Sequence, residues 1–288
     1  MNKPIILENG YNTSGLYAFI TSMFLARSDS VIKLLNIDGE DIRISYVQEF
    51  LKENIIGRFQ MNRSMPISSI NRFRNLLFNF GWRRDVRNDI NLLLSDTDPT
   101  DIYNFLFAKR MQNKLYFERV ESKENKVDTI SFDAIEIGLG DLVFSDGKLP
   151  IINLSSSIKN WIQKYVAQSE NHNYSYRFKD LPYLIPVFID PAINNTNEES
   201  RVPIDIKEAI GFQSLNDPVQ KIFTWDIQSI VLFNYENKEY SSLIRNENDD
   251  WFLVSQSTIP SNIKIDMSDP NVVKVISRQI RAVFYKIK

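Results

Sequence analysis

The hydrophobic periodicity of the chain changes near residue 114, and this change constrains the fold more than any other feature. Before it, apolar residues recur at the three- and four-residue spacing of helices. After it, short runs that read as strands predominate, separated by polar turns. Helices followed by a mostly antiparallel sheet predict an α+β fold. Because no internal repeat and no clean linker interrupts the chain, we expect a single domain over residues 1–288.

Helices are predicted over 14–27, 70–80 and 158–166, with a further helix that begins near Pro99. Asn12 or Thr13 is the expected N-cap of the first, and Asp98 that of the helix at Pro99. Strands are predicted over 115–121, 126–132, 182–189, 227–233, 240–245, 251–254 and 279–287. The last strand is apolar on both alternations, which predicts a central position in its sheet.

The composition removes many kinds of catalytic site. The chain has no cysteine and one histidine, His172, so disulfides, thiolate zinc sites and histidine-rich metal sites are excluded. We therefore expect no metal and no cofactor. His172 lies in a polar stretch and is predicted to be a solvated loop residue. Aromatic residues make up 12% of the chain, so large side chains for a hydrophobic core are plentiful. Metal-binding and nucleophilic side chains are scarce. This balance favours binding over catalysis.

The charge pattern argues against direct binding of nucleic acid or membranes. Lys and Arg number 34 against 36 Asp and Glu, a formal net charge of −2. Five arginines cluster at 72, 74, 83, 84 and 87, but Asp85 and Asp89 interleave with them, which predicts a solvated, salt-bridged face. The sequence shows no signal peptide and no long apolar span, so a cytoplasmic or nuclear location is expected, not secretion. Its Asn, Ile and Lys usage is typical of an AT-rich genome such as that of a parasite or a large DNA virus.

Five segments, in order along the chain, resemble the ubiquitin-specific proteases, a papain-like family. Residues 9–17 (NGYNTSGLY) resemble the family's cysteine box, N-x-G-N-T-C-Y, and residues 100–106 (TDIYNFL) resemble its Q-D-A-x-E-F-L helix. The later family strands are matched by residues 180–188 with 202–206, 225–252 and 280–286. The resemblance implies a helical thumb, about 1–112, packed on a sheet-rich palm with reduced fingers, about 113–288.

All three members of the family's catalytic triad are replaced in this sequence. Ser14 occupies the cysteine position, Glu239 the histidine position and Ser255, followed by Gln256, the aspartate position. Asn9 matches the asparagine that supports the oxyanion hole, although the glycine beside it is shifted by one place. The Cys-x-x-Cys pairs of the family's fingers are absent.

These replacements predict the loss of catalysis. A glutamate, whose ordinary pKa is about 4.3, is a weaker base than a histidine near 6.5 by about 3 kcal/mol, and its charge would oppose a developing oxyanion. Ser255 supplies no charge to stabilise a protonated partner. Each position also has a structural interpretation: Thr13 and Ser14 as helix caps, Asn9 as a turn residue and Glu239 as a hairpin residue. Trp225, Tyr240 and Trp251 are expected in the core or as partly buried sheet residues.

We therefore expect a pseudoprotease that serves as a protein-interaction or scaffold subunit, with ubiquitin or a ubiquitin-like protein among its candidate partners. Two alternatives stay open. One is a residual hydrolase that uses Ser14, since burial could raise the pKa of Glu239. The other is a subunit of a viral or RNA-processing assembly that never meets ubiquitin.

Overall fold

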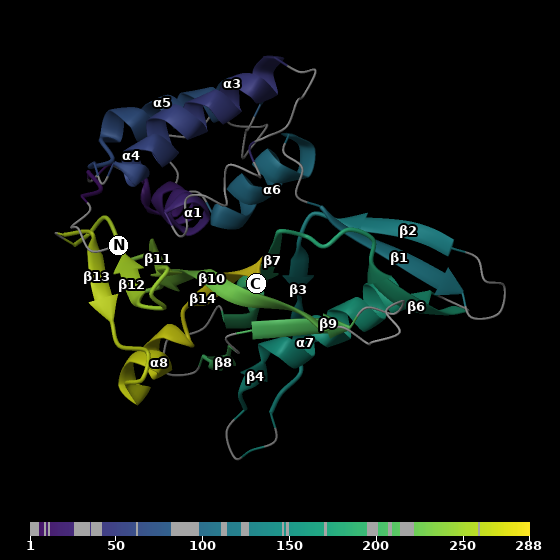
Figure 1. Cartoon of the computed structure of the whole chain (residues 1–288). Coiled ribbons are helices and arrows are strands. Elements are labelled where there is room, and N and C mark those ends of the chain that lie inside the picture. The colour runs from purple at the N-terminus through teal and green to yellow at the C-terminus, as the bar shows by residue number, and fades with distance from the viewer. Residues whose placement is uncertain are drawn as a thin grey trace. The chain divides into compact units, whose positions relative to one another are not determined.

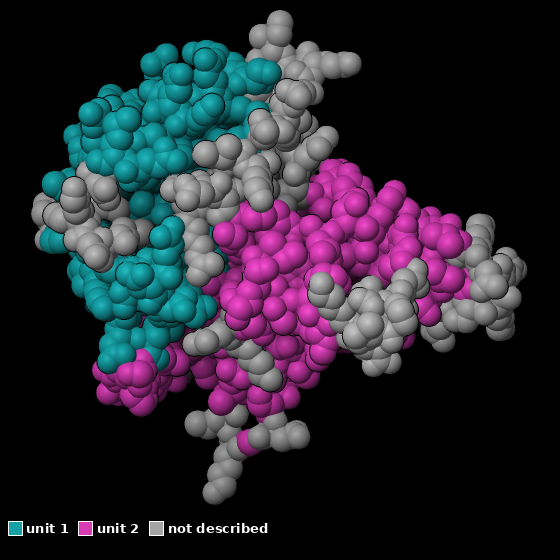
Figure 2. All heavy atoms as spheres, viewed as in Figure 1, with its two compact units in different colours: residues 1–112, 228–267 teal, residues 113–227, 268–288 magenta. Residues whose placement is uncertain are grey.

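The computed structural model describes residues 6–8, 10, 12–25, 35, 42–61, 63–81, 98–110, 114–121, 127–145, 147, 150–169, 172–194, 201–206, 209–213, 222–258 and 260–288. The chain forms two compact units (Figure 2). The first unit comprises residues 1–112 and 228–267, and the second comprises 113–227 and 268–288. The strand β10 (Ile222–Asn234) runs across the boundary between them. Helices and antiparallel strands give the α+β class that the sequence predicts.

The first unit combines a group of helices with antiparallel strands, which Figure 1 labels. Its helices are α1 (Ser14–Phe24), α3 (Ile42–Phe50), α4 (Gly57–Gln60), α5 (Ile67–Asn79) and α6 (Pro99–Arg110), and a π-helical segment η1 (Leu51–Ile56) joins α3 to α4. The end of β10 pairs antiparallel with β11 (Glu239–Arg245), which pairs with β12 (Trp251–Val254) and, through it, with β13 (Asn262–Ile265). The structure confirms the predicted helices at 14–27 and 70–80, with small shifts at their ends. It also confirms the predicted strands at 227–233, 240–245 and 251–254.

A hydroxyl network seats α1 on the strands of the first unit. All eleven residues of α1 are buried. The Ser242 hydroxyl of β11 accepts from Thr21 at 2.8 Å and from Ser22 at 2.9 Å, and donates to Ala18 O at 2.8 Å. Ser229 of β10 donates to Ser22 O at 2.9 Å. Small side chains let the helix backbone approach the strands closely, and each buried hydroxyl has a partner, as burial of polar groups requires.

The second unit contains a four-stranded antiparallel sheet in the order β2-β1-β6-β5. Its strands are β1 (Leu115–Glu121), β2 (Val127–Phe132), β5 (Gln168–Ser169) and β6 (His172–Phe178). The expectation of a loop at His172 was wrong: this residue begins β6 and pairs with Ser169. The alternation of aromatic residues at 174, 176 and 178 continues the strand back into the polar stretch.

A second group of strands in this unit surrounds β14 (Ile280–Ile287). β14 lies between β10 and β7 (Leu184–Ile189), and its first six residues are buried, which confirms the predicted central strand. β3 (Ile135–Ile137) adds to β7 in parallel, β9 (Ala209–Gln213) pairs with β10, and β4 (Ile152–Asn153) pairs with β8 (Ile204–Asp205). The remaining elements are η3 (Leu139–Asp141), α7 (Leu154–Ile162), η4 (Gln163–Ala167), η5 (Pro191–Asn194) and α8 (Pro270–Ile276).

Aromatic side chains fill the core of the second unit. Phe178 stacks on Phe117 with ring centroids 4.5 Å apart, and lies 5.5 Å from Trp225. Trp225 is fully buried and its indole N–H donates to Pro182 O at 2.8 Å. Trp251 and Tyr240, in the first unit, are each 9% exposed, so the prediction that all three are core residues is confirmed.

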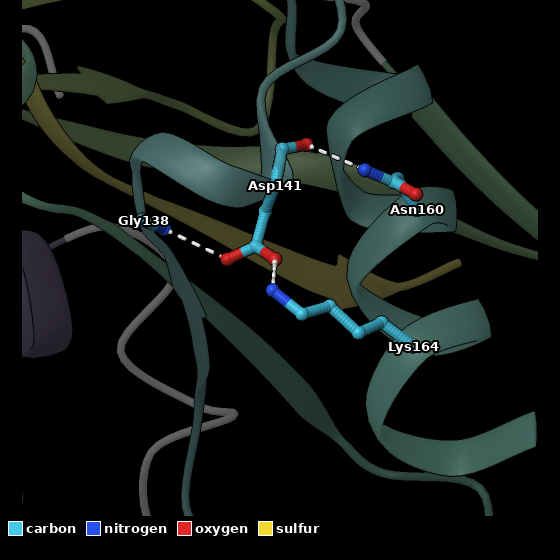
Figure 3. A network of polar contacts seen from close by, with 4 residues as sticks. All are labelled: Gly138, Asp141, Asn160 and Lys164. Carbon is cyan, nitrogen blue, oxygen red and sulfur yellow. Dashed lines mark hydrogen bonds and ion pairs between the residues drawn. The ribbon is translucent and has the colours of Figure 1, made fainter. Parts of the chain in front are cut away.

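A buried carboxylate fixes the η3 turn to α7 and η4 (Figure 3). Asp141 is 3% exposed and accepts from the Gly138 N–H at 3.0 Å and from the Lys164 ammonium at 3.1 Å. The Asn160 side chain donates to its carbonyl oxygen at 3.2 Å. The carboxylate and the carbonyl oxygen of Asp141 are both hydrogen-bonded, so this network holds the η3 turn in place.

Candidate functional site

The start of α1 and the start of β11 meet in the first unit. Ser14, the first residue of α1, is 2% exposed, and its Oγ accepts a hydrogen bond from the backbone N–H of Tyr240 at 3.1 Å. Tyr240 is the second residue of β11, directly after Glu239. The fold therefore brings the cysteine-like position of the sequence next to the histidine-like position, although they are more than 220 residues apart in the chain.

The capping role expected for Thr13 was wrong. Thr13 stands at the N-cap position, but its side chain caps no helix N–H. Its hydroxyl lies 2.8 Å from Gly10 O and 2.6 Å from Gln256 Oε1, both of which accept hydrogen bonds. The Thr13 backbone is helical (φ −111°, ψ −4°) instead of extended, so its hydroxyl lacks the usual N-cap geometry and donates to these carbonyl oxygens. The Ser14 hydroxyl is likewise turned to β11.

Glu239 opens β11 at the end of a tight hairpin. It pairs in register with Asn234 of β10, and the connecting turn places Lys238 at a φ of 55°. The Asn234 side chain accepts from the Glu236 N–H at 2.9 Å, which stabilises this turn. Glu239 is half-buried, and its place agrees with the hairpin interpretation.

Ser255 uses its hydroxyl within its own turn. Its Oγ lies 2.7 Å from Ser257 Oγ, and its N–H donates to Ser261 O at 2.8 Å. The residue that reaches α1 from this turn is Gln256, through its contact with Thr13. The sequence drew attention to Gln256 only as the neighbour of Ser255. The signal that could have identified it is a side chain long enough to reach the α1 N-terminus.

The segment before Ser14 is anchored on both sides. The Glu8 carboxylate accepts from the Ile67 N–H of α5 at 2.9 Å, and the Leu7 N–H donates to Ser261 Oγ at 2.9 Å. Tyr17 of α1 donates from its hydroxyl to Glu8 O at 2.9 Å. Burial, reinforced by the Glu8 charge, raises the pKa of Tyr17 above its ordinary value, so the phenol stays protonated and able to donate. Asn9 and Tyr11 lie outside the described residues.

Arg74 of α5 corrects the expectation of a solvated basic face. It is 4% exposed, and its guanidinium donates to Asn12 O. Asn12 has a φ of 51°, a left-handed conformation that Asn tolerates better than most residues. The arginine therefore supports the turn that leads into Ser14. Arg72 lies over the Phe50 ring at 5.6 Å, and the arginines at 83, 84 and 87 lie outside the described residues.

The Tyr240 side chain joins β11 to α6. Its hydroxyl donates to Asp98 Oδ2 at 3.0 Å, while Asp98 Oδ1 accepts from the Thr100 N–H at 2.8 Å. The second contact is the N-cap that the sequence predicted. Asp98 thus binds both the start of α6 and β11. Tyr240 is hydrogen-bonded through its backbone N–H and through its side-chain hydroxyl, which fixes its position.

The described residues offer little chemistry beyond this site. No group of three or more of them among His, Cys, Asp and Glu is placed to hold a metal ion. None of the helices that the structure describes is long and apolar enough to cross a membrane. Among the described residues at the start of α1, the buried Ser14 hydroxyl and the Tyr240 amide that donates to it are the groups in contact.

Comparison with solved structures identifies the fold. A chain of the SAGA Ubp8/Sgf11/Sus1/Sgf73 DUB module bound to ubiquitin aldehyde is similar over 98% of this chain and 69% of that chain, with a TM-score of 0.58 at 11% identity. This chain has a ubiquitin-protease-like fold. The Ubp8-Sgf11-Sgf73-Sus1 SAGA DUB module gives a TM-score of 0.54 at 12% identity, over 98% and 67% of the two chains.

A structure of an essential yeast splicing factor is also similar, with a TM-score of 0.55 at 12% identity, over 100% of this chain and 70% of that one. No family model and no curated protein matches the sequence. The similarity therefore lies in the backbone fold, on which different functions can be built.

Proposed function

We propose that this protein is a catalytically silent relative of the ubiquitin-specific proteases that acts by binding protein partners. The buried Ser14 hydroxyl, which accepts the Tyr240 N–H, carries this proposal. A serine nucleophile needs a base that removes its proton and a path for the substrate carbonyl. Ser14 is 2% exposed, and the hydrogen bond from the Tyr240 N–H makes its oxygen a poorer nucleophile.

The other two replaced positions support the same conclusion. A glutamate stands at position 239 in place of the family's histidine, and the Ser255 hydroxyl lies 2.7 Å from Ser257 Oγ. Beside Ser14, the Thr13 hydroxyl donates to the Gln256 side chain, so these two polar groups already satisfy each other. A scaffold that keeps a protease fold without these groups keeps its surfaces for binding.

Ubiquitin is the first partner to test, because a similar structure contains ubiquitin aldehyde. Titration of ¹⁵N-labelled ubiquitin with the full chain should give saturable shift changes. The matched test of catalysis uses a ubiquitin–fluorophore conjugate with the wild type and Ser14→Ala. Saturable shifts without turnover support the proposal. Turnover that Ser14→Ala abolishes would establish the residual hydrolase instead.

A second candidate is a subunit of an RNA-processing or viral assembly that does not bind ubiquitin. The similarity to the splicing factor, which extends over the whole chain, favours it. Absence of ubiquitin shifts at millimolar concentration, together with crosslinking of this chain to ribonucleoprotein subunits in its source cells, would select this candidate. Crosslinks to ubiquitinated proteins would select the first.

A further inference from the structure

The short helix α8, which precedes β14 in the second unit, leaves most of its apolar surface uncovered (Figure 1). Of its seven residues, Pro270–Ile276, only Ile276 is buried. Val273 is 39% exposed and Val275 is 50% exposed, and the lysine between them is exposed as well. Helices of globular proteins owe most of their stability to the packing of an apolar face. α8 therefore carries apolar side chains that its own chain does not use for packing.

The valines of α8 are not explained by helix formation. Valine loses side-chain freedom in a helix and is a poorer helix former than alanine, leucine, lysine or glutamate. At an exposed position, where packing does not decide the choice, a good helix former is favoured. Three valines, at 272, 273 and 275, stand in this seven-residue helix. Their grouping favours a surface that another molecule covers.

Arg278 follows the helix and holds a buried donor that lacks an acceptor. Its backbone N–H donates to Val275 O at 3.2 Å, which places the residue one turn after Val275. The residue is half-buried, and its Nε is buried without a hydrogen-bond partner among the described residues. A buried donor without an acceptor is costly. The acceptor that suits a guanidinium best is a carboxylate, which binds it through two parallel hydrogen bonds.

Two aspartates near α8 do not supply this acceptor. Asp269 caps the start of the helix, where its Oδ1 accepts a backbone N–H at 2.8 Å. Asp205 follows Ile204, whose N–H donates to Ser277 O at 2.9 Å. Neither aspartate forms an ion pair with Arg278 in the described part of the chain. A carboxylate from another molecule would therefore complete the hydrogen bonding of the guanidinium.

We infer that Val273, Lys274, Val275 and Arg278 bind an acidic amphipathic segment of a partner protein. A carboxylate of this segment accepts from the Arg278 guanidinium, and an aliphatic or aromatic side chain beside it covers Val275. Lys274 adds a second cation; its charge also complements the C-terminal end of the helix dipole, which explains neither the buried Nε nor the exposed valines. This inference gives a surface to the protein binding proposed above and rests on that proposal.

The composition of this surface favours a protein segment over nucleic acid. Affinity for nucleic acid comes from many phosphate contacts, whereas the end of α8 offers two cations, Lys274 and Arg278. Phosphates would also leave the valines in water, while an amphipathic segment removes their apolar surface from it. Because the surface is small, a short peptide should bind with a dissociation constant on the order of 0.1–1 mM.

Fluorescence polarisation with the full chain tests the inference with three labelled probes. The first is a peptide of about four helical turns that has Leu and Phe at i, i+3 and i+4 and Asp or Glu elsewhere. The second is a Glu/Ser peptide of the same charge, and the third is a single-stranded oligonucleotide. We expect saturable binding of the amphipathic peptide, about fivefold weaker binding of the Glu/Ser peptide, and no binding of the oligonucleotide.

Arg278→Gln and Val275→Glu should each weaken binding of the amphipathic peptide about tenfold. The first removes the guanidinium, and the second sets a like charge against the peptide. Arg63→Gln, the same change at an exposed arginine of the first unit, is the matched control and should leave binding unchanged. Thermal unfolding followed by circular dichroism shows whether each variant is folded.

No binding of the amphipathic peptide by the wild type, or equal binding by folded Arg278→Gln and Val275→Glu variants, would overturn the inference. Binding of the oligonucleotide that is lost in Arg278→Gln would also overturn it, in favour of nucleic acid. Ubiquitin shift changes that persist where the peptide does not bind would refute this surface alone and leave the proposed binding of protein partners intact.

Discussion

The hydroxyl oxygen of Ser14 accepts the backbone N–H of Tyr240 at 3.1 Å, which links the start of α1 to the start of β11. In a cysteine protease of this fold the corresponding side chain would have to face a substrate carbonyl. Here it accepts a hydrogen bond from the buried backbone amide of Tyr240. The position that is expected to carry the chemistry thus contributes to stability, and this role can be measured.

Ser14→Ala should destabilise the fold. The change leaves the Tyr240 N–H without this acceptor in a buried place, which costs about 1–3 kcal/mol. Urea unfolding followed by far-ultraviolet circular dichroism gives the free energy of unfolding. Ser155→Ala is the matched control, since Ser155 lies in the first turn of α7 and is only half-buried. An equal effect of the two changes would remove the structural role of Ser14.

Ser242→Ala should also cost about 1–3 kcal/mol of unfolding free energy. It removes the acceptor of Thr21 and Ser22 and the donor to Ala18 O from a fully buried interface. Ser241→Ala, one residue earlier on β11 and half-buried, should change stability by less than about 0.5 kcal/mol. If Ser242→Ala is equally mild, the hydroxyl network does not hold α1 on the strands.

Two buried tyrosines should respond differently to loss of the hydroxyl. Tyr17 donates to Glu8 O, whereas the Tyr285 hydroxyl is buried without a hydrogen-bond partner among the described residues. Tyr17→Phe should therefore cost about 1 kcal/mol, and Tyr285→Phe should be neutral or slightly stabilising. Urea midpoints of the two variants decide the point, and a reversed order would contradict these hydrogen-bond assignments.

Stability should fall as the pH rises above about 10. Burial raises the pKa of Tyr17 and Tyr285 in the folded chain, while an unfolded tyrosine ionises near pH 10. The stabilising contribution is therefore complete below about pH 10 and is lost as the pH rises from there toward the folded pKa. At pH 11 each tyrosine accounts for a loss of about 1 kcal/mol.

Urea midpoints between about pH 8 and 11, for the wild type and for the chain carrying both Tyr17→Phe and Tyr285→Phe, test this prediction. The double variant should show the shallower alkaline decline, because two buried phenols no longer ionise on unfolding. Identical slopes would mean that neither tyrosine is linked to the alkaline loss.

The sequence predicts elements well where periodicity and capping agree. Asp98 before Pro99 correctly marks the start of α6, and the doubly apolar pattern at 280–287 correctly places β14 inside its sheet. Its predictions fail where a distant partner decides. Thr13 reads as a cap from its neighbours alone, but its hydroxyl caps no helix N–H and donates to the distant Gln256 side chain. Arg74 reads as a surface charge, because nothing local reveals that the Asn12 carbonyl turns toward it.

In the candidate site, too, the sequence predicts the positions of the residues but not their distant contacts. Comparison with the family motifs named Ser14, Glu239 and Ser255, and the structure places Ser14 beside the residue that follows Glu239. The inward turn of the Ser14 hydroxyl and the use of the Ser255 hydroxyl inside its own turn depend on rotamers and backbone approach. Such contacts are set by tertiary packing and leave no periodic trace in a sequence.

Release of fluorophore from a ubiquitin conjugate, measured at micromolar chain for wild type and Ser14→Ala, tests the loss of catalysis most directly. If Ser14 has only a structural role, both chains give the rate of the buffer alone across about pH 6 to 9. A wild-type rate above that background which disappears in a folded Ser14→Ala variant would show that the serine is a working nucleophile.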